Sequence, residues 1–140
     1  MKKLIVTMLS LVMVLGLVAC GTVEQKESEH TITYNDARKV VMNEMEYLGI
    51  FCQYTNNSDE TCLPCDEVDV KAFQNGIALT IIVYTGQTTE GAIQCDTAIQ
   101  AGITAEVVWL YELQDDSIVS LEFSDGSKME VELEGVVEEN

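Results

Sequence analysis

The chain is poor in histidine, proline and basic residues. Its 140 residues include one histidine, one proline and seven lysines and arginines, against 24 aspartates and glutamates, so the formal net charge is −17. A surface of this sign repels the phosphate backbone, which argues against nucleic acid as a partner. No Gly-x-Ser-x-Gly motif occurs, and the lone histidine lies too near the start to serve a folded active site. We therefore expect no enzyme activity and no cofactor.

The strongest motif lies in the first 21 residues. Lys2 and Lys3 precede an almost unbroken apolar run over residues 4–15, and small residues follow, which is the pattern of a secretory signal. Residues 17–20, Leu-Val-Ala-Cys, resemble the lipobox of bacterial lipoproteins. The resemblance implies cleavage before Cys20, acylation of its thiol and a lipid anchor in the outer face of the cell membrane.

Two other interpretations of this segment stay open. The uncharged stretch over residues 4–23 approaches the ~20 residues that cross a bilayer, so an uncleaved membrane helix is the first. Ordinary signal cleavage with a free thiol on Cys20 is the second. Cleavage before Cys20 leaves 140 − 19 = 121 residues, enough for one domain. It also removes two lysines, which takes the net charge from −17 to −19.

The remaining chain divides by composition. We expect residues 1–19 to be the signal peptide, 20–33 a flexible tether, 34–136 a single domain and 137–140 an acidic tail. His30 falls in the expected tether, where no fixed geometry supports a role as base or metal ligand. The acidity serves solubility, or it favours a basic protein partner or cations.

Four cysteines remain if Cys20 carries lipid, and three of them lie in a polar stretch over residues 52–67 that we expect to be a loop. An even number in an exported domain predicts two disulfides, in any of three connectivities. The short spacing of the Cys-Leu-Pro-Cys motif favours Cys62–Cys65 with Cys52–Cys95. The expected disulfide residues are thus Cys52, Cys62, Cys65 and Cys95.

The same motif allows two other chemistries. In thioredoxin-like enzymes a Cys-x-Pro-Cys motif follows a strand and begins a helix that lowers the thiol pKa. Here the preceding residues are polar, acidic neighbours oppose ionisation, and the chain has no second proline. A four-cysteine zinc site is the other alternative, although Cys52 and Cys95 do not form a second Cys-x-x-Cys pair. The aspartates and glutamates near Asp66 lack the spacing of a calcium loop.

Apolar residues recur at helical spacing in two segments. The first predicts a helix over residues 35–48, ended by Gly49. The second predicts a helix within residues 86–103, capped by Thr88 or Thr89. The apolar faces consist of Ala37, Val41, Met45 and Leu48, and of Ala92, Cys95 and Ile99.

Alternating apolar residues predict five strands. Asn75-Gly76 is typical of a two-residue hairpin turn and pairs Ala72 with Leu79. The same register continues with Val70 opposite Ile81 and Val68 opposite Val83. Strands over residues 107–113, 119–123 and 129–133 predict a meander.

The length of the last loop of that meander follows from which residues must pair on the buried face. A three-residue loop places Leu121 opposite Met129 and Val119 opposite Val131, all on one face, and requires Gly126 at positive φ. Together these elements predict an α+β fold, an antiparallel sheet of about five strands with one or two helices packed on one face.

We expect a lipid-anchored extracytoplasmic protein, a non-enzymatic binding or envelope-assembly domain joined to the membrane through Cys20. An inhibitor or decoy for a basic partner is one form of this hypothesis. The alternative is a thiol–disulfide or cysteine-based metal-binding protein that acts through Cys62 and Cys65.

Overall fold

Strands account for most of the folded chain. The computed structural model describes residues 29–84 and 91–133. Within these ranges the structure contains one helix, only four residues long. The elements are β1 (His30–Met42), β2 (Met45–Asn56), α1 (Pro64–Glu67), β3 (Val70–Gln74), β4 (Ile77–Ala78), β5 (Ile81–Ile82), β6 (Ile93–Gln94), β7 (Thr104–Glu112), β8 (Val119–Phe123) and β9 (Lys128–Val131).

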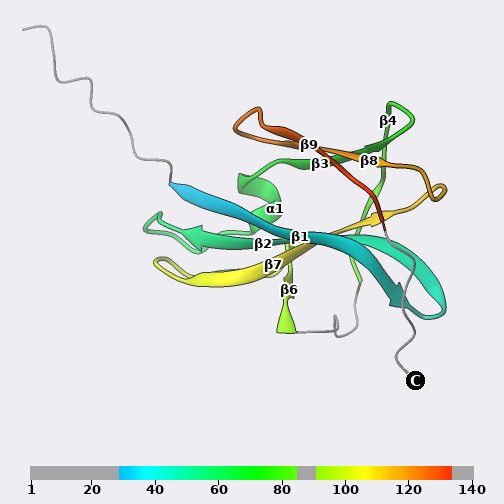
Figure 1. The fold of residues 1–140 in the computed structure, drawn as a ribbon. Coiled ribbons are helices and arrows are strands. Elements are labelled where there is room, and N and C mark those ends of the chain that lie inside the picture. Colours follow the sequence, from blue (N-terminus) through cyan, green and yellow to red (C-terminus); the bar gives the residue numbers. More distant parts are fainter. Residues whose placement is uncertain (1–28, 85–90, 134–140) are drawn as a thin grey trace, which may run out of the picture.

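The strands form two sheets, which Figure 1 shows as two layers. One sheet has the order β1-β2-β7-β5, with the short β6 parallel to β7. The other has the order β4-β3-β8-β9 and is antiparallel throughout. This arrangement contradicts the α+β fold expected from the sequence, because no helix packs on either sheet in the described residues.

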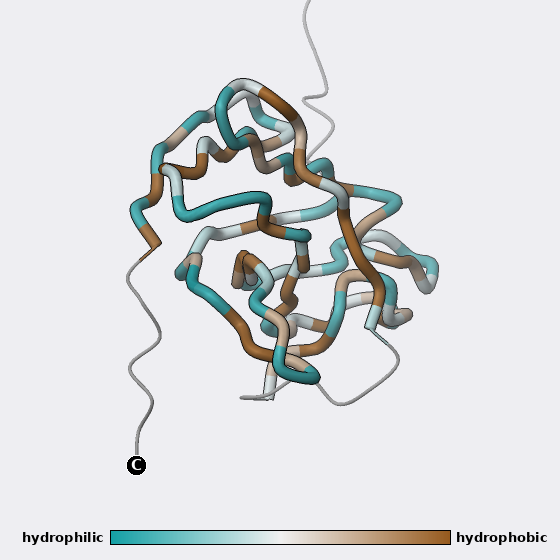
Figure 2. Tube along the Cα trace, turned by 90° about the vertical axis from the view of Figure 1, so that its right-hand side faces the viewer, coloured by the Kyte–Doolittle hydropathy of each residue, from teal (hydrophilic) through white to brown (hydrophobic). Residues whose placement is uncertain are grey.

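The main core lies between the two sheets. Every second residue of a strand faces the same side, so β2 and β7 each contribute alternate side chains, among them Tyr54 and Trp109. Val70 of β3 and Leu121 of β8 meet them from the other sheet. In Figure 2 hydrophobic and hydrophilic residues alternate along much of the trace, as expected for strands with one buried face.

A second apolar cluster covers the outer face of the first sheet. Phe51, Val108 and Leu110 pack there with Val40, Met42 and Ala92. The Arg38 guanidinium lies 3.8 Å from the centre of the Phe51 ring, a cation–π contact at the edge of this cluster. Both faces of β7 are therefore buried, which explains its continuous apolar run.

The predicted helix over residues 35–48 is wrong, because these residues form most of the β1–β2 hairpin. Asn43 and Glu44 make its turn, with φ angles of 50° and 65°. Two residues of the expected helical face, Val41 and Met45, are 46% and 54% exposed. The residues that are buried instead, Val40 and Met42, alternate as strand residues do.

A bulge in β1 explains why the pattern resembled a helix. The register with β2 shifts between Tyr34 and Asp36. Ile32 and Tyr34 pack on the main core before the shift, and Ala37 does so after it. The inward positions therefore change from even to odd, and a strand with such a change no longer shows a strict period of two.

The second predicted helix is also wrong over the residues that the structure describes. Residues 91–103 form β6 and a series of turns. Its expected apolar face is divided, because Ala92 packs in the outer cluster whereas Cys95 and Ile99 pack in the main core. The expected capping residues Thr88 and Thr89 lie outside the described residues.

The turn at Asn75-Gly76 is confirmed, but the hairpin is much shorter than expected. Gln74 pairs with Ile77, and the Leu79 N–H donates to the Ala72 carbonyl at 2.8 Å. The chain then crosses to the other sheet, where Ile81 pairs with Tyr111. The expected Val70–Ile81 pair is therefore wrong, as Val70 pairs with Phe123 of β8.

The loop between β8 and β9 is confirmed in register and length. Leu121 pairs with Met129 and Val119 with Val131, while Gly126 has φ 85°. The three-strand meander is nevertheless wrong, because β7 belongs to the first sheet and β8 pairs with β3 instead.

Candidate functional site

The segment that carries the Cys-x-x-Cys motif is held by a buried amide. The expected loop over residues 52–67 is shorter than predicted, because β2 continues to Asn56. The Asn56 side chain is fully buried and donates to the carbonyls of Glu60 at 2.8 Å and Ile99 at 3.0 Å. Its oxygen accepts from the Ser58 N–H at 3.0 Å. One side chain thus ties the start of this loop to the segment after β6.

A short bridge fixes Cys62 itself. The Cys62 N–H donates to the Ile99 carbonyl at 3.1 Å, and the Ile99 N–H donates back at 2.8 Å. Pro64 then begins α1 at a position where its missing N–H has no cost. The helix has one turn and no preceding buried strand, so the thioredoxin-like arrangement of this motif is not reproduced.

Four polar side chains form a hydrogen-bonded chain at this end of the molecule. The Tyr54 hydroxyl lies 3.1 Å from the Cys62 sulfur and 2.7 Å from Nδ1 of His30. Nε2 of His30 lies 3.1 Å from a Glu67 carboxylate oxygen. The His30 and Tyr54 rings are stacked, with centroids 5.8 Å apart. The chain therefore links β1, β2, the cysteine loop and α1.

The expected setting of His30 in a flexible tether was wrong. His30 is the first residue of β1, and its side chain is only 12% exposed. Sequence reasoning missed it because no apolar pattern surrounds it. The alternation of Cys52, Tyr54 and Asn56 could have identified a strand. A neighbouring strand must pair with its edge, and that strand is β1, which begins at His30.

The hydrogen bonds that join these four side chains can all run in one donor-to-acceptor direction. If Glu67 accepts from Nε2–H of a neutral His30, Nδ1 accepts from the Tyr54 hydroxyl. The Tyr54 oxygen can then accept from the Cys62 thiol. Burial, followed by the hydrogen bond with Cys62, raises the pKa of Tyr54, so its hydroxyl remains protonated at neutral pH. The four side chains thus form one continuous hydrogen-bonded path from the Cys62 sulfur to the Glu67 carboxylate.

A cleft of about 490 Å³ opens beside this chain. His30, Cys62 and Glu67 contribute to its wall, and further carboxylates surround it. It therefore presents a thiol within a strongly acidic surface. The acidic residues that line the cleft are Glu29, Asp59, Glu60, Asp66 and Glu67.

The structure brings Cys65 and Cys95 together. The Cys65 N–H donates to the Cys95 carbonyl at 3.0 Å, which brings the two residues side by side. Burial raises the pKa of both thiols, with the neighbouring Cys65 contributing further at Cys95. Cys52 is apart from them in the middle of β2, opposite Val107, and burial raises its pKa to about 12.

The expected pairs Cys62–Cys65 and Cys52–Cys95 are not formed. All four cysteines are free thiols in the structure, and no two sulfur atoms are at disulfide distance. The described residues also contain no group of three or more His, Cys, Asp or Glu side chains arranged to hold a metal ion. The structure therefore gives the four-cysteine zinc alternative no geometric support.

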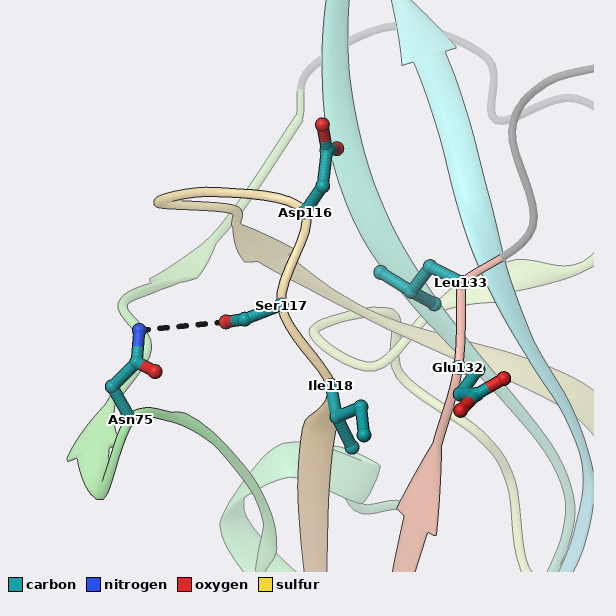
Figure 3. Close-up of a pocket in the computed structure, with 6 residues that line it drawn as sticks. All are labelled: Asn75, Asp116, Ser117, Ile118, Glu132 and Leu133. Carbon is teal, nitrogen blue, oxygen red and sulfur yellow. Dashed lines mark hydrogen bonds between the residues drawn. The ribbon is translucent and has the colours of Figure 1, made fainter.

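A second cleft, of about 600 Å³, lies beside the turn before β8 (Figure 3). On one side the Asn75 amide donates to the Ser117 hydroxyl at 3.4 Å, and on the other side lie Glu132 and Leu133. Asp116 and Ile118 complete its lining. The cleft offers carboxylates, the Ser117 hydroxyl and apolar surface, and its lining residues include neither a thiol nor a histidine.

The segment before residue 29 lies outside the described residues, so the structure does not bear on Cys20. Over residues 29–84 and 91–133, no helix is long and apolar enough to cross a membrane.

Comparison with known proteins gives one finding. No curated protein and no solved structure matches the chain significantly. A family model described as a domain of unknown function (DUF5067) matches residues 22–125. The match begins two residues after Cys20, contains both sheets up to the end of β8 and includes all four cysteines of the folded part. The chain belongs to the DUF5067 family.

Proposed function

We propose that this protein is a lipid-anchored extracytoplasmic binding domain without enzyme activity. The observation that carries the proposal is the sequence Leu-Val-Ala-Cys at residues 17–20, which resembles a lipobox and directly precedes the matched domain. The domain match begins at residue 22, so cleavage before Cys20 leaves the whole matched region intact. Two or three acyl chains on Cys20 anchor a domain stably, whereas a single chain holds it only marginally.

Fatty-acid labelling in the protein's own host tests the anchor. The wild-type protein should incorporate labelled fatty acid and fractionate with membranes, and Cys20→Ala should do neither. Cys52→Ala is the matched control, because it removes a thiol in the core and should leave labelling unchanged. Protease added to intact cells should digest the domain from outside. Labelling of Cys20→Ala, or protection of the domain from protease, contradicts the proposal.

The partner that fits this surface is basic. Five carboxylates line the cleft beside Cys62 within a chain of net charge −17. Such a surface attracts cationic ligands, and their binding should weaken strongly from low to physiological ionic strength.

Oligolysine is a suitable probe for this partner class. A variant with Asp59→Asn, Glu60→Gln and Asp66→Asn should bind oligolysine at least several-fold more weakly than wild type. The matched control neutralises three exposed acids elsewhere, Glu44, Glu130 and Glu132, and should retain most of the binding. Equal losses in both variants would show that net charge alone attracts the probe, and the cleft would then have no special role.

The hydrogen-bonded chain supports a second candidate, a thiol function at Cys62. Cys62 lines the cleft, and its thiol contacts Tyr54, which in turn contacts His30. A thiol with a path for its proton can attack a disulfide or another electrophile, since the thiolate is the reactive form. The partner cysteine expected for such chemistry, Cys65, instead lies beside Cys95.

Alkylation rates test this candidate. Cys62 should react with iodoacetamide at neutral pH several-fold faster in wild type than in His30→Gln, which cannot pass the proton on. Tyr54→Phe should slow the reaction similarly, and Thr31→Ser on the neighbouring strand position is the control. Identical rates in all four proteins would remove the thiol candidate.

A further inference from the structure

The four cysteines of the folded part occupy three different environments. Cys52 is fully buried in β2, where it pairs in register with Tyr34 and Val107. Cys62 contacts Tyr54 and lines the acidic cleft. Cys65 and Cys95 are neighbours joined by a backbone hydrogen bond.

The backbone brings Cys65 and Cys95 to disulfide spacing. A single backbone hydrogen bond of 3.0 Å joins the Cys65 N–H, in α1, to the Cys95 carbonyl, in the turn after β6. One N–H to carbonyl bond of this length places the two Cα atoms roughly 5–6.5 Å apart. A disulfide spans Cα separations of about 4.4–6.8 Å. The backbone spacing therefore permits a disulfide between these two residues, although their sulfur atoms are not at disulfide distance in the structure.

The two sulfurs also differ in access. Cys65 is partly exposed and lines a third cleft, of about 270 Å³, beside Asp69 and Trp109. Cys95 is 3% exposed. A reagent from solvent therefore reaches Cys65 first, and Cys95 is positioned to complete the reaction from the interior.

We propose that Cys65 and Cys95 form a disulfide in the exported protein, while Cys62 and Cys52 remain thiols. The proposal rests on the proposed export, which supplies an oxidising compartment. The oxidant is a disulfide donor, a small disulfide or an oxidised thiol oxidase. The Cys65 thiolate attacks one donor sulfur, the donor disulfide breaks, and its first thiol leaves with a proton. Cys95 then attacks the mixed disulfide at Cys65 and releases the second donor thiol.

The bond joins α1 to the segment around β6. It closes a loop of 95 − 65 = 30 residues, and a closed loop of this size restricts the unfolded chain. The disulfide would reinforce the backbone bridge between Cys62 and Ile99. The Cys62 thiol and the cleft beside it would thereby keep their geometry.

Peptide mapping of the full-length protein, purified from host membranes without reductant, tests the pairing. Free thiols are alkylated in denaturant before proteolysis. The expected result is a cross-linked pair of fragments that contain residues 62–65 and Cys95, with one alkylated cysteine on the first fragment and another at Cys52. A cross-link between Cys52 and Cys95, a ring within residues 62–65, or alkylation of all four cysteines would overturn the proposal.

Single substitutions identify which residue of the motif is bonded. No acidic or basic residue separates Cys62 from Cys65, so common proteases leave them on one fragment. The cross-link should disappear in Cys65→Ser and persist in Cys62→Ser. Without reductant, Cys65→Ser should also lower Tm by roughly 10 °C relative to Cys62→Ser, and reductant should remove most of that difference. A cross-link that is lost only in Cys62→Ser contradicts the assignment.

The same sample separates this inference from the proposed anchor. The N-terminal fragment reports the lipid on Cys20, and the cross-linked fragments report the disulfide. An acylated Cys20 with four alkylated cysteines overturns only the disulfide. An unmodified Cys20 with the cross-link intact overturns only the anchor. In folded protein Cys62 should be alkylated rapidly, whereas Cys52 should react only after unfolding.

Discussion

Two fully buried amide side chains each organise a loop. Asn56 ties the cysteine loop to Ile99, as described above. The Gln74 amide donates to the carbonyls of Asp115 and Ser117 at 2.9 and 3.1 Å, and its oxygen accepts from the Gln114 N–H at 2.9 Å. A buried polar group costs stability unless it is paired, so both side chains exchange water for backbone partners. Each therefore fixes one loop conformation.

Asn56→Ala should destabilise the protein by about 2–3 kcal/mol, because it leaves buried carbonyl and N–H groups without partners. Urea unfolding measures the change. Asn57→Ala is the matched control, since that amide is exposed and makes a hydrogen bond to Thr31 at 2.8 Å. Its effect should stay within about 0.5 kcal/mol. Similar losses in both variants would contradict the role of Asn56.

Gly49 is the residue most constrained by packing in the β1–β2 hairpin. A Cβ at this position would lie 2.7 Å from Cγ2 of Val40 and 2.8 Å from Cε2 of Phe51. Gly49→Ala should therefore cost about 1–3 kcal/mol through overpacking. In a Val40→Ala background, Gly49→Ala should lower stability by less, because the Val40 methyl group that it meets is absent. A double-mutant cycle measures this difference. A neutral Gly49→Ala would contradict the observed packing.

The buried thiol of Cys52 predicts a dependence of stability on pH. Its pKa is raised to about 12 in the folded protein by burial, from an unfolded value near 9. The folded state therefore keeps a proton that the unfolded state loses, and stability falls as pH rises from about 9 to 12, by up to about 1.4 kcal/mol per unit. The pKa values of Tyr54 and Tyr111 are raised by burial too.

Comparison with Cys52→Ala isolates the contribution of this thiol. Unfolding measured under reducing conditions should show a shallower loss of stability with alkaline pH in the variant than in wild type. The tyrosines remain in both proteins, so their contribution cancels. Parallel curves for the two proteins would show that Cys52 titrates normally in the folded state.

At the scale of elements, the β1–β2 hairpin is the clearest departure from the sequence pattern. A helix and a bulged strand both bury residues at mixed spacings, and only the partner strand decides between them. Tight turns were predicted correctly because their residues act locally. Asn75-Gly76 and Gly126 need positive φ whatever strand follows.

Glu44→Gly distinguishes hairpin from helix directly. In the hairpin Glu44 has φ 65°, where glycine is at no disadvantage, so the substitution should stabilise the protein by about 0.5–1 kcal/mol. In a helix the same substitution would destabilise by about 1 kcal/mol. Thermal unfolding gives the sign, and far-ultraviolet circular dichroism checks that strand content is unchanged.

For the whole molecule, sheet membership could not be predicted. β3 and β8 are far apart in the chain, and so are β5 and β7, yet each pair is joined. The register predicted from the turn at Asn75 therefore fails beyond Leu79, because the polypeptide crosses there from the second sheet to the first. The site was predicted only in part. Its cysteines were identified, but their neighbours His30 and Tyr54 depend on the pairing of β1 with β2.

The acidic charge acts on the molecule as a whole, together with the proposed lipid anchor. If the proposed cleavage and acylation occur, the remaining chain of net charge −17 − 2 = −19 repels anionic lipid headgroups, so the folded part should stand away from the membrane. In the proposed anchored protein, the cleft and its thiol would then be accessible to a soluble partner.

The intact mass of the mature protein, isolated from membranes of its own host without reductant, tests the account most directly. We predict a polypeptide without residues 1–19, with fatty-acyl groups on Cys20 and with two hydrogens fewer than the fully reduced polypeptide. A mass that includes the leader, or one that shows an unacylated amino terminus, would contradict it.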